Sequence, residues 1–384
     1  MADNPPVADY DRGVTAQHLP ADVPFFAQWA QRGSKPRTLD SAIALMTLLD
    51  FSPPPSLAVV GSKGKGTAAA AASTALSASG LTTVAVTSPA FRSNRERIRL
   101  DGRAISDADY RLISSRLSEV LGSLPSEHYL SPSGAFTITG AWWASMIGAD
   151  VLVLEEGMGG KTDEVSLFSH RAMAVTPIFE EHIGIIGDDL RSVAENLLGA
   201  GSDTIEFVGT ARQSPVVNAL IEQNVSDWGA DVVPSSPIAH TNPLIGENLG
   251  LGHAIGAALS EALGREAQPL PSLHLPGRTS IHHGPRGTWC VDAAISPAGV
   301  RAALAAAPLT NPTLVASWPL SKDVAACREI VPGAIHVSVP GLPYPDLPRF
   351  AEVVEGLEGD VLALGTISFI AEVLEYLKVP TDLW

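Results

Sequence analysis

The sequence has little cysteine, no long hydrophobic run and few basic residues. Cys290 and Cys327 are its only cysteines, and their spacing is not that of a metal site, so we expect two reduced thiols in a cytoplasmic protein. No run approaches the roughly 18 apolar residues that cross a bilayer. Residues 1–13 carry acids and prolines where a secretory signal has basic and apolar parts, so we expect neither export nor a membrane partner.

The charge balance also excludes a class of partner. The sequence has 25 Lys and Arg against 41 Asp and Glu, a formal net charge of −16. Nucleic acid is therefore not an expected partner. Hydrophobic residues make up 45% of the chain and charged residues 17%, a composition that excludes wholesale disorder. Because 384 residues exceed what one core usually organises, we expect two domains.

A glycine-rich loop near the start of the chain predicts a phosphate-binding site. Residues 57–60 are apolar and read as a strand, residues 61–67 (GSKGKGT) as a loop, and the following alanine-rich run as a helix. Gly61, Gly64 and Gly66 permit a tight turn, and the helix N-terminus together with Lys65 and Thr67 can hold anionic oxygens. The spacing departs from G-x-x-x-x-G-K-[ST], and the alternative is a flexible loop with solvated lysines. The order of strand, loop and helix favours a nucleoside triphosphate.

The rest of the chain alternates between strand and helix patterns. Apolar runs at 149–154, 172–178 and 204–208 predict buried parallel strands, with helices at 40–49, 189–198, 215–224 and 247–263. After a proline-containing stretch at 268–280 the alternation restarts, with strands at 288–294, 312–318, 334–339 and 360–364 and helices at 297–306, 323–330, 346–357 and 368–377. We therefore predict an α/β protein: a P-loop ATPase domain with a mostly parallel sheet (1–274), and a doubly wound, Rossmann-like domain (279–384).

Two polar groups follow predicted strands at the edge where parallel sheets bind ligands. Glu155 ends the 149–154 strand, and a carboxylate there suits magnesium together with the hydroxyls of Thr67 and Ser88. His182 follows the next predicted strand. A lone histidine is usually a hydrogen-bonded structural residue, and its position makes a metal or phosphate contact an equal alternative.

The order of these motifs resembles that of the folylpolyglutamate synthetase and Mur ligase family, over most of the chain. Family members show GTNGKGS, TSPHL, NERI, EVGLGGR, a DH pair, REN, PGR, DGAHNP and a closing GS strand. The corresponding segments here are GSKGKGT (61–67), TSPAFRSNRERI (87–98), LEEGMGGKTD (154–163), EEH (180–182), GEN (246–248), LPGR (275–278), VDAAISPAG (291–299) and ALGTISF (363–369).

The resemblance implies an ATP- and magnesium-dependent amide ligase. In such enzymes a substrate carboxylate takes the γ-phosphoryl group, and the amine of an amino acid, with glutamate as one candidate, attacks the acyl phosphate. It implies catalytic roles for Lys65, Glu155 and His182 and metal contacts from Thr67, Ser88, Glu155 and His182. It further implies nucleotide contacts from the loop glycines and from Asn248, Arg278 and Asp292, and closure of two domains that excludes water.

Several positions depart from the family motifs. Ala90 replaces a histidine, Arg95 an asparagine, and Ile295 and Ser296 a histidine and an asparagine. Leu197 stands where the family has a carbamylated lysine, and leucine cannot carry that anionic metal ligand.

These departures leave more than one function open. The leading hypothesis is a ligase for a specialised acid, with Arg92 and Arg95 contacting an anionic acceptor other than folate. The alternatives are solvated surface arginines, a degenerate nucleotide-binding homologue that serves as a scaffold or partner subunit, and a simple P-loop kinase or NTPase.

Overall fold

The structure is a computed structural model that describes residues 20–30, 38–125, 127, 129–320, 322–340, 342, 344 and 346–384. Residues 1–13, on which the expectation of no export rests, lie outside this range. No helix within the described residues is long and apolar enough to cross a membrane. The cytoplasmic location stays a prediction.

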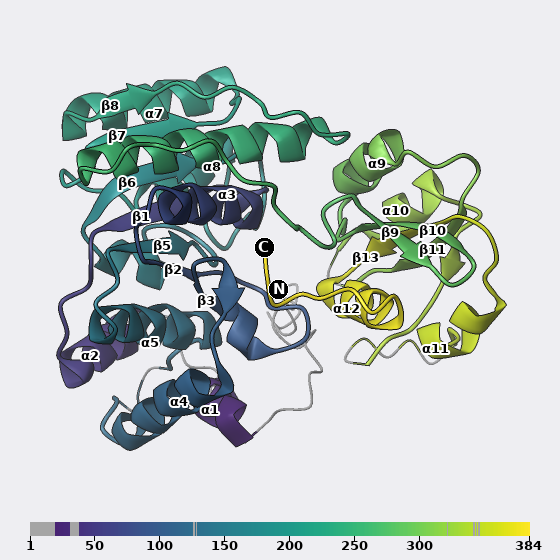
Figure 1. Cartoon of the computed structure of the whole chain (residues 1–384), viewed down its shortest axis with the longest axis horizontal. Helices are drawn as coiled ribbons and strands as arrows, with labels where there is room; N and C mark the ends of the chain where they lie inside the picture. The colour runs from purple at the N-terminus through teal and green to yellow at the C-terminus, as the bar shows by residue number, and fades with distance from the viewer. Residues whose placement is uncertain are drawn as a thin grey trace, which may run out of the picture.

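The chain forms two lobes, each built on its own sheet (Figure 1). Within the described residues the first sheet has eight strands in the order β4-β3-β2-β5-β1-β6-β7-β8. At one edge β3 pairs antiparallel with both β2 and β4, and all other neighbouring strands pair parallel. The strand bounds are β1 Ser56–Val60, β2 Thr83–Val86, β3 Ile98–Leu100, β4 Arg103–Ala104, β5 Val151–Glu155, β6 His170–Val175, β7 Phe207–Thr210 and β8 Asp231–Val233.

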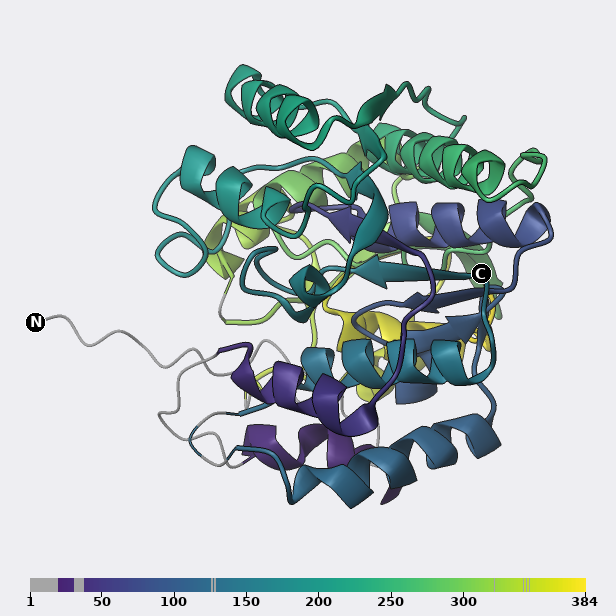
Figure 2. The ribbon, with the colours of Figure 1, turned by 90° about the vertical axis from the view of Figure 1, so that its left-hand side faces the viewer.

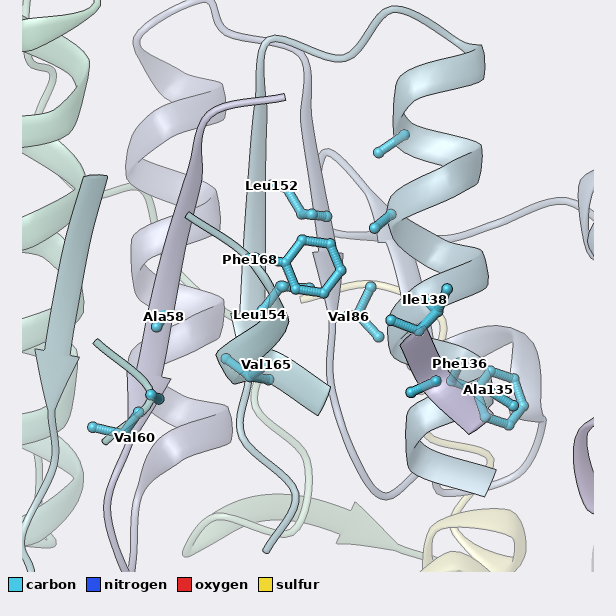
Figure 3. Packing of buried hydrophobic residues seen from close by; sticks show 14 of the residues in the cluster. Ala58, Val60, Val86, Ala135, Phe136, Ile138, Leu152, Leu154, Val165 and Phe168 are labelled. Carbon is cyan, nitrogen blue, oxygen red and sulfur yellow. The ribbon is translucent and has the colours of Figure 1, made fainter. Parts of the chain in front are cut away.

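Helices cover both faces of the first sheet, because its central strands are apolar on both faces. On one face Leu57 and Val59 of β1 pack with α3 and α8, and on the other Ala58 and Val60 pack with α2, α5 and their neighbours (Figures 2 and 3). The helix bounds are η1 Pro20–Asp22, α1 Val23–Ala30, α2 Asp40–Leu49, α3 Lys65–Ala78, η2 Asn94–Arg97, α4 Asp107–Leu121, α5 Pro132–Met146, η3 Glu164–Leu167, α6 Leu190–Leu198, α7 Pro215–Trp228 and α8 Pro243–Ala262.

The second lobe is a smaller α/β sandwich. Among the described residues its sheet has the order β12-β11-β13-β10-β9, with only β9 antiparallel. The helices α9 and α10 cover one face, and α11 and α12 the other. The bounds are β9 Ser280–Gly284, β10 Gly287–Asp292, α9 Pro297–Ala306, β11 Thr313–Ser317, α10 Val324–Ile330, β12 Ile335–His336, α11 Phe350–Val353, η4 Val354–Gly356, β13 Val361–Gly365 and α12 Ile367–Tyr376.

After α12 the chain returns to the first lobe. The segment 379–384, here named the C-terminal tail, lies along the edge strand β4. Asp382 O of the tail accepts a hydrogen bond from Ala104 N (2.8 Å), and Trp384 N donates one to Gly102 O (3.1 Å). The tail thus extends the first sheet, and with the segment between α8 and β9 it makes two crossings between the lobes (Figure 1).

The α/β class and the mostly parallel first sheet are confirmed. The helices predicted at 40–49 and 297–306 have those bounds, whereas β7 lies two or three residues later than predicted. The helix predicted at 346–357 is wrong in length, because α11 spans only Phe350–Val353 and a 3-10 turn follows. The domain boundary, placed between 274 and 279, falls between α8 and β9, and the division into domains stays a prediction.

Candidate active site

The glycine-rich loop lies between β1 and α3, as the sequence predicts. Gly61 and Gly64 have φ of +126° and +97°, backbone angles that residues other than glycine rarely adopt. A Cβ at Gly61 would lie 2.7 Å from the carbonyl oxygen of Thr176, and one at Gly64 would overlap the amide of Asn248. Both glycines are therefore required by conformation and by close approach.

The start of α3 presents unpaired N–H groups. Ala68 N donates to Gly64 O (3.0 Å), so the N–H groups of residues 65–67 precede the first bond within the helix. They point out of the helix N-terminus, where the helix dipole favours anionic oxygens. Lys65 Nζ donates to Gly61 O and so stays close to the loop. This is the geometry of a phosphate site.

Glu155 lies beside this helix start. It ends β5, and its Oε2 accepts the N–H of Ser88 (3.0 Å). A Cβ added to Gly66 would lie 3.5 Å from Glu155 Oε1 and 3.8 Å from an Nη atom of Arg278. Burial raises the pKa of Glu155, while the Ser88 N–H, Lys65 and Arg278 oppose the rise. A carboxylate and a guanidinium thus flank the first turn of α3.

These groups share one cleft between the lobes. The cleft opens to solvent, and its cavity volume is about 50 Å³. The first lobe, the inter-lobe segment and the C-terminal tail all line it: Gly66, Thr67, Thr87, Ser88, Pro89, Phe91, Glu96, Arg99, Glu155, Leu275, Pro276, Arg278, Thr381 and Trp384. The structure therefore brings together Gly66, Thr67, Ser88, Glu155 and Arg278 from the predicted set.

Among the predicted residues outside the cleft lining are Gly61, Gly64 and Lys65, and three more that lie near the loop. His182 has φ of +50°, and burial, followed by the charges of Lys322 and Lys65, lowers its pKa to about 4. Asn248 is fully buried against Gly64 and donates to Leu244 O (2.8 Å). Asp292 accepts both the N–H and the hydroxyl of Thr279 (2.8 and 2.7 Å). In this arrangement Asn248 and Asp292 hold the loop and the inter-lobe segment in place, and their nucleotide contacts stay predictions.

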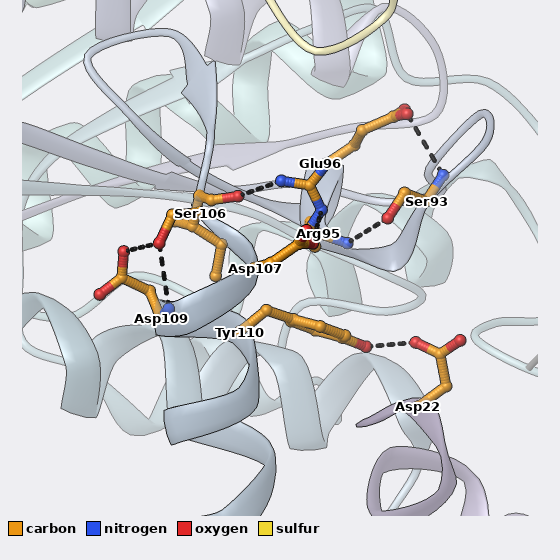
Figure 4. A network of polar contacts seen from close by, with 9 residues as sticks. Asp22, Ser93, Arg95, Glu96, Ser106, Asp107, Asp109 and Tyr110 are labelled. Carbon is orange, nitrogen blue, oxygen red and sulfur yellow. Dashed lines mark hydrogen bonds and ion pairs between the residues drawn. The ribbon is translucent and has the colours of Figure 1, made fainter. Parts of the chain in front are cut away.

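The two arginines predicted to bind an acceptor are engaged elsewhere. Arg92 Nε pairs with Glu375 of α12 (3.0 Å), and Arg95 Nε pairs with Asp107 (3.0 Å) while its Nη1 donates to Ile105 O (2.8 Å) (Figure 4). Neither residue lines the cleft. Each guanidinium has a carboxylate partner in this structure, and the substrate role of Arg92 and Arg95 stays a prediction.

Figure 4 shows that the segment 93–110 is held by local polar contacts. Glu96 Oε1 accepts from Ser93 N (3.2 Å), and Tyr110 donates to the buried Asp22 (2.5 Å). Two residues that sequence reasoning missed come from the same segment. Arg97 donates to Ser88 Oγ (2.9 Å) below the cleft, and Arg99 lines the cleft itself. Arg99 is part of β3, and Arg97 directly precedes that strand at the end of η2.

Glu156 is a further missed residue. It is 1% exposed, its Oε2 accepts the N–H of Gly61 (3.2 Å), and burial raises its pKa to about 8. The family motif EVGLGGR has valine at this position. The buried carboxyl group therefore supports the loop from below, a role that a motif match alone does not reveal.

Comparison with known proteins gives the relationship. No family model matches the chain. It is 26% identical over 300 residues to the probable bifunctional folylpolyglutamate synthase/dihydropteroate synthase of Halobacterium salinarum, covering 67% of this chain and 36% of that protein. It is 30% identical over 219 residues to the dihydrofolate synthase/folylpolyglutamate synthase of Mycobacterium tuberculosis, covering 52% of this chain and 44% of that protein. The chain is therefore similar in sequence to folylpolyglutamate synthases.

Solved structures of folylpolyglutamate synthases share the fold. The apo form of L. casei FPGS has a TM-score of 0.76 at 22% identity, covering 92% of this chain and 99% of that one. M. tuberculosis folylpolyglutamate synthase complexed with ADP has a TM-score of 0.72 at 20% identity, covering 93% and 99%. The resemblance stated from the motifs is confirmed. The curated alignments span less than half of the relatives' own length, so activity and substrates are matters of proposal.

Three of the predicted metal ligands lie together in the cleft, and magnesium binding stays a prediction. Glu155 and the hydroxyls of Thr67 and Ser88 line the cleft together, a donor set that magnesium accepts beside phosphate oxygens. Leu197 is 1% exposed within the apolar core, so it offers no ligand. Within the described part of the chain no group of three or more His, Cys, Asp or Glu side chains is placed to hold a metal. A second ion therefore lacks a built site here.

Proposed function

We propose that this protein is an ATP-dependent amide ligase that activates a carboxylic acid as an acyl phosphate and joins it to the amine of an amino acid. One observation carries the proposal: Gly66 and Thr67 in the first turn of α3, which begins at Lys65, line the same cleft as Glu155, Ser88 and the inter-lobe residue Arg278. A site that only held a nucleotide would not need a carboxylate at the helix start. A transferring phosphoryl group does, through its metal ion.

The chain's own residues account for the charge changes of the reaction. An acceptor carboxylate oxygen bonds to the γ-phosphorus as the bond to the β-phosphate oxygen breaks and ADP leaves. The amine nitrogen then bonds to the acyl carbon, phosphate leaves, and the amine gives up a proton. The N–H groups of residues 65–67, Lys65 and Arg278 hold the phosphate oxygens, and Glu155, Thr67 and Ser88 would hold magnesium, which supplies charge neutralisation when bound.

Several of the relatives are named for folate substrates, and one solved structure of similar fold is described as an FPGS-AMPPCP-folate complex. For this chain we propose an acid acceptor other than a housekeeping folate. The support is the set of departures at Ala90, Arg95, Ile295 and Leu197, together with a cleft bounded by Arg99 and Trp384. Equilibrium binding of dihydrofolate, pteroate and small dicarboxylic acids tests this: tight folate binding would overturn it.

The experiment for the ligase itself is ADP release with ATP, magnesium, glutamate and a panel of carboxylic acids. We expect release that requires both the acid and the amino acid and that falls at least about 100-fold in Lys65→Ala, because removal of one preorganised charge contact costs that much. The control is Lys378→Ala, since Lys378 is an exposed lysine on the second lobe. Release that needs no amine acceptor would indicate a kinase or NTPase instead.

A catalytically silent scaffold is the second candidate, and one observation favours it. The position of the family's anionic metal ligand is the buried Leu197, and the described residues contain no replacement cluster. This reading predicts nucleotide binding at the loop without ADP release under any combination of acid and amine. Turnover that depends on the amino acid excludes it.

A further inference from the structure

Lys63 reaches from the phosphate loop of the first lobe to a helix of the second. Its backbone N–H donates to Pro177 O (3.3 Å), which fixes it in the loop. Its side chain is half-buried, and the Nζ atom lies against the first turn of α9. A Cβ added to Gly299 in that turn would lie 2.5 Å from Lys63 Nζ. The glycine therefore leaves the space that the ammonium group occupies.

The surroundings of this ammonium group are mostly positive. Burial lowers the pKa of Lys63; Asp292 opposes that change, and Arg278 and Lys322 add to it. The N-terminus of α9 adds a positive dipole end. Among the described residues Lys63 forms no ion pair, and Asp292 is already bonded to Thr279. The negative charge of Asp292 remains despite these hydrogen bonds, but it offsets only part of the effect of burial and of the neighbouring cations on Lys63. A bound oxyanion would therefore stabilise the ammonium group further.

The same region also contains the positive end of α3. Arg278 lies within reach of Gly66 in the first turn of α3, and it is also a charge neighbour of Lys63. Arg278 thus links the two helix starts: it lies close to the first turn of α3 and acts on Lys63, which lies against the first turn of α9. The family loop GTNGKGS has asparagine at the position of Lys63, so this chain carries a positive charge that the motif lacks.

We propose that Lys63, Arg278 and the first turn of α9 form an oxyanion site between the lobes. Its ligand is an oxyanion of the reactants: the terminal phosphoryl group of the nucleotide or the carboxylate of the incoming amino acid. The identity of that oxyanion rests on the proposed ligase function. The site itself does not, because any bound oxyanion would relieve the repulsion between the cations.

Calorimetric titration of the full chain tests the site without measuring turnover. The probes are AMPPCP with magnesium, ADP with magnesium, and glutamate added to protein saturated with AMPPCP. The variants are Lys63→Gln, the charge-conserving Lys63→Arg, and Lys378→Gln as a matched exposed control. Thermal unfolding of each variant establishes that it folds.

If the oxyanion is the phosphoryl group, Lys63→Gln weakens the affinity for AMPPCP at least about tenfold and changes the affinity for ADP by no more than about twofold. Lys63→Arg then restores most of the lost AMPPCP affinity. If it is the carboxylate, both nucleotides bind as in the unsubstituted protein and glutamate binding falls by a similar factor. If Lys63→Gln equals Lys378→Gln for all three probes, the site does not exist. Loss of the ligase function alone, with the AMPPCP difference intact, would leave the site standing.

Discussion

At the scale of single residues, the site depends on glycines whose backbone no other residue adopts easily. Gly61→Ala should lower the free energy of unfolding by about 2–4 kcal/mol, because a forbidden φ adds to an overlap with backbone. Gly61 has φ of +126° and would place a Cβ 2.7 Å from Thr176 O. Urea unfolding measures the change.

Gly80 is the matched control for this prediction. It has φ of +82° with nothing within 4 Å of an added Cβ. Gly80→Ala should therefore cost only about 1 kcal/mol, the price of the backbone conformation. Equal effects of the two substitutions would show that the close approach at Gly61 is unimportant.

His170 gives the chain a pH-dependent stability term. It is 1% exposed, with its ring nitrogens 2.9 Å from Ser56 Oγ and from Val165 O. Burial lowers the pKa of His170 from 6.5 to about 4, and the hydrogen bond with the Val165 carbonyl opposes this change. Between these values the unfolded chain binds the proton and the folded chain does not, so stability is present above pH 6.5 and is lost as pH falls towards 4.

Between pH 6.5 and pH 4, His170 should lower the free energy of unfolding by about 3 kcal/mol. His170→Gln removes it, so the variant should lose less stability on acidification than the unsubstituted protein. Urea unfolding at several pH values measures both slopes. Parallel slopes would contradict a buried, neutral histidine.

At the scale of elements, the contact between α3 and α8 sets the position of the phosphate loop. Gly252 and Gly256 of α8 let the helix approach the carbonyl groups of Ala68 and Ala72 on α3. Gly252→Ala would overlap Ala68 O and push the helices apart. We expect a loss of about 1–3 kcal/mol in unfolding free energy and a weaker affinity for AMPPCP, because α3 carries the binding loop.

Gly122, which follows α4, is the control for that prediction. Nothing lies within 4 Å of a Cβ added there. Gly122→Ala should change the unfolding free energy by no more than about 0.5 kcal/mol and leave AMPPCP affinity unchanged. If Gly252→Ala behaves in the same way, the small residues of α8 do not determine the loop position.

Element prediction succeeded where a pattern is strong and local. The strand, loop and helix of residues 57–78 were evident because apolar residues, glycines and alanines follow one another in the order that the fold needs. The strands β3, β4 and β9 were not predicted, since short or edge strands lack a clear apolar pattern. The helices α4 and α5 were also missed.

The site was predictable in part for the same reason. Glu155 and Thr67 are in place because parallel strands end at one edge of a sheet. The parts contributed by tertiary contacts were not: Thr381 and Trp384 enter the cleft because the tail returns to β4, which no local pattern indicates. Arg92 and Arg95 were chosen by charge alone, and their carboxylate partners lie on α12 and at the start of α4.

At the scale of the whole molecule, the C-terminal tail joins the lobes on one side of the cleft. Arg99 donates to Thr381 O (2.8 Å), its guanidinium lies 4.7 Å from the ring centre of Trp384, and Thr381 donates to Glu96 (2.8 Å). Trp384→Ala should lower the unfolding free energy by about 1–3 kcal/mol through lost packing and lost cation–π contact.

Hydrogen exchange locates the effect of that substitution. The N–H groups of Ala104 and Trp384, which bond across the tail and β4, should exchange faster in Trp384→Ala. Leu383→Ala is the control: Leu383 is 39% exposed, so its substitution should change the unfolding free energy little. Unchanged exchange at Ala104 in Trp384→Ala would mean that the aromatic ring does not hold the tail.

The central claim is that the start of α3 and Lys65 hold a nucleoside triphosphate in the cleft between the lobes. Calorimetric titration of AMPPCP with magnesium into the full chain, beside Lys65→Ala, tests it most directly. The account predicts one site per chain and an affinity at least about tenfold weaker in Lys65→Ala, with thermal unfolding of the unliganded variant little changed. The absence of binding to the unsubstituted chain, or equal affinity in Lys65→Ala, would contradict it.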